Sequence, residues 1–207
     1  MPLLPARRAC RIACILLLAA ALPGVVAPAA ATDAPRPGQL LIASRSMGDP
    51  RFSEAVILIL HHDAGGAFGI VINRPIGERS IKSLLAATGE GKEVGVTGNL
   101  RVFAGGPVEP QLGFVIHTPD YRRKDTLTID DEVAMTADRA ILVDIGHRHG
   151  PRKSLIAFGY AGWAAGQLEA EIADHAWYIA PGDPRLIFDT PRAELWDKAM
   201  ARRLHEL

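Results

Sequence analysis

Short apolar runs alternate along the chain with segments rich in glycine and proline. One run, "AVILILHH" at residues 55–62, is continuously apolar and rich in β-branched residues, which predicts a strand buried on both faces. The "DAGG" that follows has glycines where a tight connection needs positive φ. "AFGIVIN" at residues 67–73 has the pattern of a return strand. We therefore predict an antiparallel hairpin over these residues.

The same reading predicts the other elements. Short strands are expected near residues 40–44, 101–104, 113–118, 154–160, 176–181 and 185–190, with two more between 119 and 136. Helices are expected at residues 80–87, from about 136–138 to 146, at 164–174, and from Pro191 onward. Turns or a single helical turn are expected at residues 46–53 and 74–79. Because hairpins are frequent and strands do not alternate strictly with helices, we predict a single α+β domain over residues 39–207.

Residues 1–31 have the pattern of a secretory signal peptide. Three arginines and no acid precede an apolar run at residues 12–22, and Ala29 and Ala31 fit the small positions of a cleavage site. The run is shorter than the roughly 18–20 residues that a membrane span needs. We expect cleavage after Ala31, with a flexible lead-in at residues 32–38. An uncleaved anchor and a misassigned start codon are the alternatives.

Removal of this segment would change the composition of the chain. Cys10 and Cys14 both lie within it, so the mature protein would have no disulfide, thiolate nucleophile or cysteine-ligated metal. The charged residues would fall from 23 basic and 23 acidic to 20 basic and 23 acidic, a net charge of −3. No basic run is longer than residues 122–124, so the clustered charge typical of nucleic-acid binding is missing. No stable membrane span is expected after cleavage.

The glycine-rich segment "GYAGWAAGQLEAEI" at residues 159–172 raises the question of a ligand-binding loop. Its glycines do not have the spacing of a phosphate-binding or dinucleotide-binding loop. Exposed N–H groups at the start of a helix could still bind an anion. Alternatively, the glycines allow a tight turn while Tyr160 and Trp163 pack as core anchors. We favour the second interpretation because no charged partner accompanies the segment.

The histidines and acids form no recognisable catalytic or metal-binding motif. "HHD" at residues 61–63 and "HRH" at residues 147–149 could supply zinc ligands, but neighbours on a strand point to opposite faces, and no third ligand is near in sequence. His117 ends a buried run and is interpreted as a hydrogen-bonded structural histidine, although it could line a pocket. No G-x-S-x-G elbow is present, and nothing singles out a pair of carboxylates.

Two strand ends carry residues typical of the rim of a binding site. They are "INRP" at residues 72–75 and "GGPV" at residues 105–108, although Asn73 is also suited to capping its own turn. We expect both segments to lie near residues 159–167. The candidate binding surface comprises Asn73, Arg74, Gly105, Gly106, Pro107, His117, Gly159, Tyr160, Gly162, Trp163 and Gln167.

Several of these stretches, taken in order, resemble the YqgE/AlgH family of bacterial proteins over residues 38–204. They are "LLIAS…DPRF", "GAFGIVINRP", "VFAGGPVEPQLGFVIHT", "FGYAGWAAGQLEAEIADHAWYIAP" and "IFDTPRAELW". The resemblance implies bent, largely antiparallel sheets that form a barrel-like core with flanking helices, in one domain with no known cofactor. The family is labelled as regulators of transcription, and no established active site comes with it.

The sequence departs from the family pattern in three ways. Ala43, Ser44 and Arg45 replace the usual "AMP". Ala164 replaces a glycine of "GWGAGQ", which we interpret as a sign that this position is already helical. A leader is unusual in the family, and an exported, slightly acidic protein cannot readily regulate promoters directly.

We therefore predict a non-enzymatic binding or interaction module that is exported to the periplasm, with an unidentified protein or small ligand as its partner. One alternative is a cytosolic regulator of transcription, which requires that the leader is not functional. The other is an enzyme of unrecognised type, in which His117, Asn73 and an acid converge in one pocket.

Overall fold

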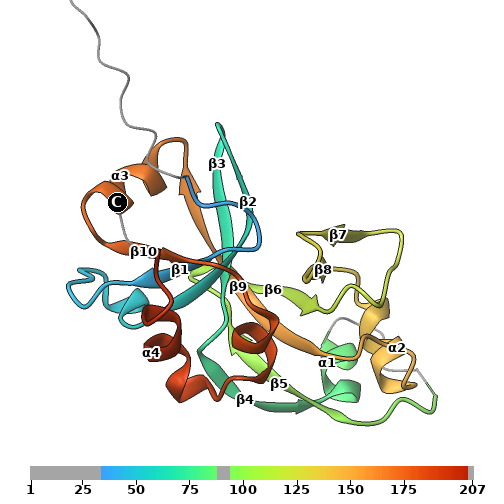
Figure 1. Cartoon of the computed structure of the whole chain (residues 1–207). Helices are drawn as coiled ribbons and strands as arrows, with labels where there is room; N and C mark the ends of the chain where they lie inside the picture. Colours follow the sequence, from blue (N-terminus) through green and yellow to red (C-terminus); the bar gives the residue numbers. More distant parts are fainter. Residues whose placement is uncertain (1–33, 88–93, 205–207) are drawn as a thin grey trace, which may run out of the picture. The chain divides into compact units, whose positions relative to one another are not determined.

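Ten strands form one hydrogen-bonded sheet in the computed structural model, which describes residues 34–87 and 94–204 (Figure 1). The strands are β1 (Leu40–Ala43), β2 (Val56–Asp63), β3 (Gly66–Val71), β4 (Pro75–Ser80), β5 (Asn99–Ala104), β6 (Val108–His117), β7 (Thr126–Thr128), β8 (Ala134–Thr136), β9 (Ser154–Ala164) and β10 (Trp177–Ala180). Their order is β10-β1-β2-β3-β9-β6-β8-β7, and β5 joins β4 to β9. Every pairing is antiparallel except β5 with β9.

The long strand β9 links the two halves of the sheet. Its last residues, from Ala161 to Ala164, pair with β3, whereas its first residues pair with β6 and β5. Gly159, with φ of +74°, lies shortly before the residues that pair with β3. The sheet curls into a half-barrel with a few short helices around it, as Figure 1 shows. The predicted α+β fold is confirmed.

The hairpin of β2 and β3 is also confirmed, and it separates two apolar cores. Asp63 pairs with Gly66 across the tight connection. Val56 and Leu58 point into a core closed by α4 (Leu195–Met200), while Ile57 and Ile59 point into a second core beneath α3 (Gln167–Ala173). All four of these β2 side chains are fully buried. This explains why the strand is apolar without alternation.

A third core lies under α1 (Ile81–Ala87) and α2 (Ala140–Gly146). The predicted amphipathic helix at residues 80–87 corresponds to α1, which buries Ile81, Leu84 and Leu85 as expected. The C-terminal helix also forms, preceded by a short 3₁₀ turn, Arg192–Glu194, that Pro191 caps. The apolar faces of these helices are what attach them to the sheet, since helices of six or seven residues are not stable alone.

Three predicted elements are wrong. Residues 74–79, expected as a turn, lie within or next to β4. Residues 185–190, expected as a strand, form a π-helical turn, Arg185–Asp189. The strand expected to end at residue 160 continues as β9 to Ala164, so α3, expected from about residue 164, begins only at Gln167. Ala164 is thus the last strand residue and not a helical one, and its backbone needs no positive φ.

The predicted signal peptide at residues 1–31 lies outside the described residues and stays a prediction. Residues 32–207 form one compact unit. Within the predicted lead-in, Pro35 is buried and its carbonyl lies 2.7 Å from Nδ1 of His62, and Gly38 donates to the carbonyl of Ile59. Among the described residues, no helix has both the length and the apolarity needed to cross a membrane.

Candidate functional site

The first part of the site is a charged turn that follows β1. Asp49 caps a single 3₁₀ turn, Pro50–Phe52, by accepting the backbone N–H of Arg51 at 2.9 Å. The Arg51 side chain folds back so that Nε and Nη2 donate to the same carboxylate at 2.6–3.1 Å. These hydrogen bonds from Arg51 lower the pKa of Asp49, and those to Asp49 raise the pKa of Arg51. Asp49 is therefore held as a paired carboxylate.

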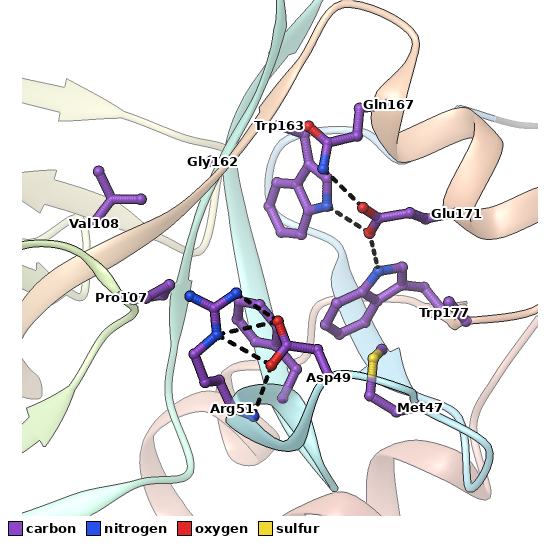
Figure 2. A pocket seen from close by; sticks show the side chains of 12 residues that line it. Met47, Asp49, Arg51, Pro107, Val108, Gly162, Trp163, Gln167, Glu171 and Trp177 are labelled. Carbon is purple, nitrogen blue, oxygen red and sulfur yellow. Dashed lines mark hydrogen bonds and ion pairs between the residues drawn. The ribbon is translucent and has the colours of Figure 1, made fainter.

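The second part is a carboxylate that three side chains share. Oε2 of Glu171, on α3, accepts the indole N–H of Trp163 at 2.9 Å and that of Trp177 at 2.7 Å. Oε1 of Glu171 accepts the side-chain amide of Gln167 at 2.8 Å. Gln167 in turn accepts the backbone N–H of Ala164 at 3.1 Å. The end of β9, the first turn of α3 and the start of β10 are thus tied to one carboxylate (Figure 2).

Local sequence explains how α3 comes to lie over the tryptophans. Gly166 adopts the left-handed conformation, with φ of 74°, and reverses the chain between β9 and α3. Leu168 and Ile172 are one helical turn apart and are buried in the core beneath the helix. Gln167 and Glu171 are also one turn apart, on a neighbouring line of the helix that faces the indoles.

These two groups line a concave pocket of about 400 Å³ (Figure 2). Its walls combine aromatic and apolar side chains with the charged and amide groups of Asp49, Arg51, Gln167 and Glu171. The lining residues are Met47, Asp49, Arg51, Phe52, Pro107, Val108, Gly162, Trp163, Gln167, Glu171, Ala176 and Trp177. A concave site of this size, lined by both aromatic and polar groups, could bind a small molecule or a side chain.

Four of the residues predicted from sequence line this pocket: Pro107, Gly162, Trp163 and Gln167. Trp163 is also a core anchor, as expected, because only 7% of it is exposed. Tyr160 lies on the other face of β9, where it packs against Phe68 and Phe114. The structural interpretation of the glycine-rich segment therefore holds for both aromatic rings, and Trp163 contributes to the pocket as well.

The other predicted glycines, Gly105, Gly106 and Gly159, lie where the turn between β5 and β6 packs on β9. Gly105 donates to the carbonyl of Phe158 at 2.7 Å, and Gly106 lies against the backbone of Tyr160. A side chain on Gly159 would overlap the carbonyl oxygen of Gly106. These glycines allow the turn between β5 and β6 to lie directly on β9, which brings Pro107 to the pocket.

Asn73 and Arg74 lie next to this region and hold the loop that follows the charged turn. Asn73 accepts the N–H of Val56 at 2.9 Å and donates to the carbonyl of Glu54 at 2.8 Å. Arg74 donates to the carbonyl of Ser53 at 2.7 Å. Asn73 therefore caps a neighbouring loop and not its own turn, and neither residue lines the pocket. The structure brings the three predicted segments together, as expected.

His117 does not line the pocket. It is fully buried at the end of β6, where Nδ1 donates to the carbonyl of Thr118 at 2.8 Å, so Nε2 accepts from the hydroxyl of Thr136 at 2.9 Å. Burial lowers its pKa, which a backbone hydrogen bond and Asp120 partly offset. It is a structural histidine, and it does not converge with Asn73. The alternative in which His117, Asn73 and an acid converge in one catalytic pocket is wrong.

The histidine pairs are bonded separately. His61 contacts Asp63 at 3.0 Å, whereas His62 contacts Glu169 at 2.7 Å. His147 contacts the carbonyl of Val94 at 3.1 Å. Within residues 34–87 and 94–204, no three histidine, aspartate or glutamate side chains are grouped closely enough to hold a metal ion.

Sequence reasoning missed the acidic and aromatic partners of Trp163. Glu171 and Trp177 come from α3 and β10, while Asp49, Arg51 and Phe52 come from a turn more than a hundred residues earlier. One local signal was present, since Gln167 and Glu171 are spaced i, i+4 immediately after Trp163. The approach of the charged turn depends on the pairing of β1 with both β2 and β10, which has no local signal.

Comparison with known proteins adds three similarities. The family described as AlgH-like matches residues 40–206. A UPF0301 protein of Jannaschia sp. strain CCS1 is 46% identical over 165 residues, which cover 79% of this chain and 85% of that protein. The solution structure of the AlgH protein from Pseudomonas aeruginosa is 39% identical, with a TM-score of 0.69 over 79% of this chain and 86% of that one.

A crystal structure of a protein from Corynebacterium diphtheriae is similar in fold alone. Its TM-score is 0.66 at 21% identity, over 83% of this chain and 89% of that one.

Proposed function

Since the chain belongs to the AlgH-like family, which brings no assigned chemistry, we propose its function from its own pocket: a non-enzymatic binding protein. The site is the pocket between the charged turn, β9, α3 and β10. The observation that carries the proposal is the surface this pocket offers. Aromatic and apolar side chains form much of its wall, Asp49 and Arg51 are paired with each other, and Glu171 accepts hydrogen bonds from neutral indole and amide groups.

The bonding of these polar groups supports binding over catalysis. A general base needs a free acceptor with a pKa near the working pH. Asp49 has a lowered pKa and is paired with Arg51, and Glu171 already accepts three hydrogen bonds. Both carboxylates therefore stabilise the walls of the pocket.

We further propose that the protein acts outside the cytoplasm. The leader pattern at residues 1–31 supports this location. A cytosolic regulator of transcription is the alternative. It would have to act through a protein partner, because the chain lacks the basic clusters that bind phosphate backbones.

The three tryptophans provide a test of the binding site. Trp163 and Trp177 line the pocket, whereas Trp196 belongs to the core closed by α4, from which its indole N–H donates to the carbonyl of Ala43. We expect titration with indole, a neutral aromatic probe, to move the NMR signals of the first two indole N–H groups and not that of Trp196. A Trp163→Leu substitution should remove the response. Equal movement of all three signals, or of none, would contradict a binding role for this pocket.

A further inference from the structure

We propose that His62 is a pH-sensitive clamp: its protonated ring holds residues 34–37 against the domain, and its neutral ring releases them. The clamp lies outside the pocket and does not depend on what the pocket binds. Three features carry the inference. Both ring nitrogens face acceptors, the ring is enclosed, and residues 34–37 have no other hydrogen bond that fixes them to the sheet or the helices of the described chain.

Both nitrogens of the His62 ring face atoms that only accept hydrogen bonds. Nδ1 lies 2.7 Å from the carbonyl oxygen of Pro35, and Nε2 lies 2.7 Å from Oε1 of Glu169 on α3. A neutral imidazole has one N–H, whereas a protonated imidazole has two. The two contacts can therefore both be hydrogen bonds only when the ring is protonated.

The ring is enclosed between the sheet and α3. His62 pairs with Ala67 of β3, which belongs to the core beneath α3. Only 7% of the His62 side chain is exposed, whereas the neighbouring side chain of His61 is 60% exposed. Pro35 is buried as well. A carbonyl that loses its donor in such a place is better satisfied by water, so loss of this hydrogen bond favours release of the segment.

The chain joins the sheet only after residue 37. Gly38 donates to the carbonyl of Ile59 at 2.8 Å, and Ile59 donates to the carbonyl of Gln39 at 2.9 Å. Before Gly38, the backbone of Arg36 bonds to Gln39, within the same segment. Among the hydrogen bonds of the described residues, the contact with His62 is thus the one that fixes residues 34–37 to another part of the domain.

Loss of one proton makes the two acceptors compete for the proton that remains. A carboxylate is a stronger acceptor than a carbonyl, so the neutral ring keeps its N–H toward Glu169. The carbonyl of Pro35 then faces a bare nitrogen at 2.7 Å, and the two lone pairs repel each other. Because histidine changes charge between about pH 5 and pH 8, the clamp is closed near pH 5 and open near pH 8.

The other charged groups around the clamp are engaged elsewhere. Asp63, next on β2, bonds to His61 and to the N–H of the hairpin turn. Glu171 of α3 accepts the indoles of the pocket. Asp130, which lies beside the start of the chain, accepts N–H groups of its own turn. Arg36 is exposed. Within the described chain, the charged partner of the ring is therefore Glu169.

Carbon-detected NMR of isotope-labelled protein, recovered from its host, tests the clamp. The carbonyl signal of Pro35 reports its hydrogen bond, and the ring nitrogens of His62 report the number of bound protons. We expect both to change together, in one transition between about pH 5 and pH 8, with two protons on the ring at the acid end. His61→Gln is the matched control, because it removes the exposed neighbouring ring, and it should leave the transition unchanged.

Two substitutions should abolish the transition in opposite ways. His62→Ala removes both donors, so the Pro35 signal should stay at its alkaline position at every pH. Glu169→Gln supplies an amide N–H that can donate to Nε2, so the neutral ring can turn its own N–H to Pro35. The Pro35 signal should then stay at its acid position. Glu169 is 38% exposed, and the indole signals of Trp163 and Trp177 check that either variant is folded.

Several outcomes would overturn the clamp. One is a ring that carries a single proton from pH 5 to pH 8, and another is a Pro35 signal that stays constant while the ring titrates. A transition that persists in His62→Ala would assign it to another group. A wild-type transition in Glu169→Gln would contradict the competition for the proton, on which release depends.

Discussion

Glu171 holds the site together at the level of single residues. Two indole N–H groups and one amide share its carboxylate, from three different elements of the fold. In a Glu171→Gln variant one oxygen becomes an N–H₂ group that faces other donors. We expect the free energy of unfolding in urea to fall by about 1–3 kcal/mol, because donors around the site lose their acceptor.

Glu194→Gln is the matched control for this prediction. Glu194 forms an exposed pair with Lys198 at 2.8 Å, one helical turn away. Such pairs contribute about 0–1 kcal/mol, so this variant should be nearly as stable as the wild type. Equal losses in the two variants would show that Glu171 has no special role in stability.

His117 makes a second prediction, which concerns pH. Its ring is buried as the neutral form, and burial lowers its pKa in the folded state below the value in the unfolded chain. The unfolded state therefore binds more protons as the pH falls. Above the unfolded pKa of about 6.5 the ring is neutral in both states, and the folded state keeps its full stability. As the pH falls below that value, the free energy of unfolding decreases by up to about 1.4 kcal/mol per pH unit.

Urea denaturation at about pH 8 and about pH 5 measures this slope. His117→Gln should be less sensitive to acid than the wild type. His175→Asn is the control, because His175 is exposed in a turn, and it should keep the wild-type slope. A wild-type slope in His117→Gln would exclude His117 as the source of acid sensitivity.

At the scale of elements, the bend of β9 depends on Gly159. Both Gly159 and Gly166 have φ of +74°, so alanine meets the same backbone strain, about 1–2 kcal/mol, at either position. They differ in their surroundings. A Cβ on Gly159 would overlap the carbonyl oxygen of Gly106 and lie 3.1 Å from that of Val108, whereas on Gly166 it would meet no atom of the described residues within 4 Å.

We therefore expect Gly159→Ala to be less stable than Gly166→Ala by about a further 1–3 kcal/mol, the usual cost of overpacking. Thermal or urea unfolding of the two variants measures the difference directly. Equal stability would mean that the turn between β5 and β6 moves away from β9 without cost.

The sequence predicted elements well where burial controls the residue pattern. The β2–β3 hairpin and α1 follow from apolar spacing alone. The sequence predictions failed where hydrogen bonds, and not burial, determine the local structure. All six residues of β4 are exposed, so hydrogen bonds to β5 define that strand and leave no apolar pattern. Residues 185–189 are apolar enough for a strand, but Asp183 caps Arg185 and turns the chain into a helical loop.

The pocket was predictable only in part for a similar reason. Trp163 and Gln167 belong to one continuous stretch and stood out. Their partners Trp177 and Asp49 meet them only after β10 and β1 have paired. Glycine spacing suggested a loop at residues 159–166, yet the glycines instead bend a strand and allow another turn to lie on it. Convergence of this kind comes from tertiary pairing, which local spacing does not encode.

At the scale of the whole molecule, location decides which partners can reach the pocket. An exported protein meets lipids and small solutes of the periplasm, whereas a cytosolic one meets nucleic acid and regulatory proteins. The leader pattern predicts that residues 1–31 are removed on export, which leaves a chain that begins at Thr32. The net charge would then be −3 in place of zero.

The intact mass of the native protein, recovered by osmotic shock from its own host, tests this prediction. A periplasmic species that begins at or near Thr32 would support export and exclude direct action on promoters. A full-length or internally started species found only in the cytosol would contradict export. The indole titration would still report on the pocket in that case, because the lining residues all follow residue 46 and do not depend on the leader. Location and binding in the pocket are therefore independent predictions, and each can fail without the other.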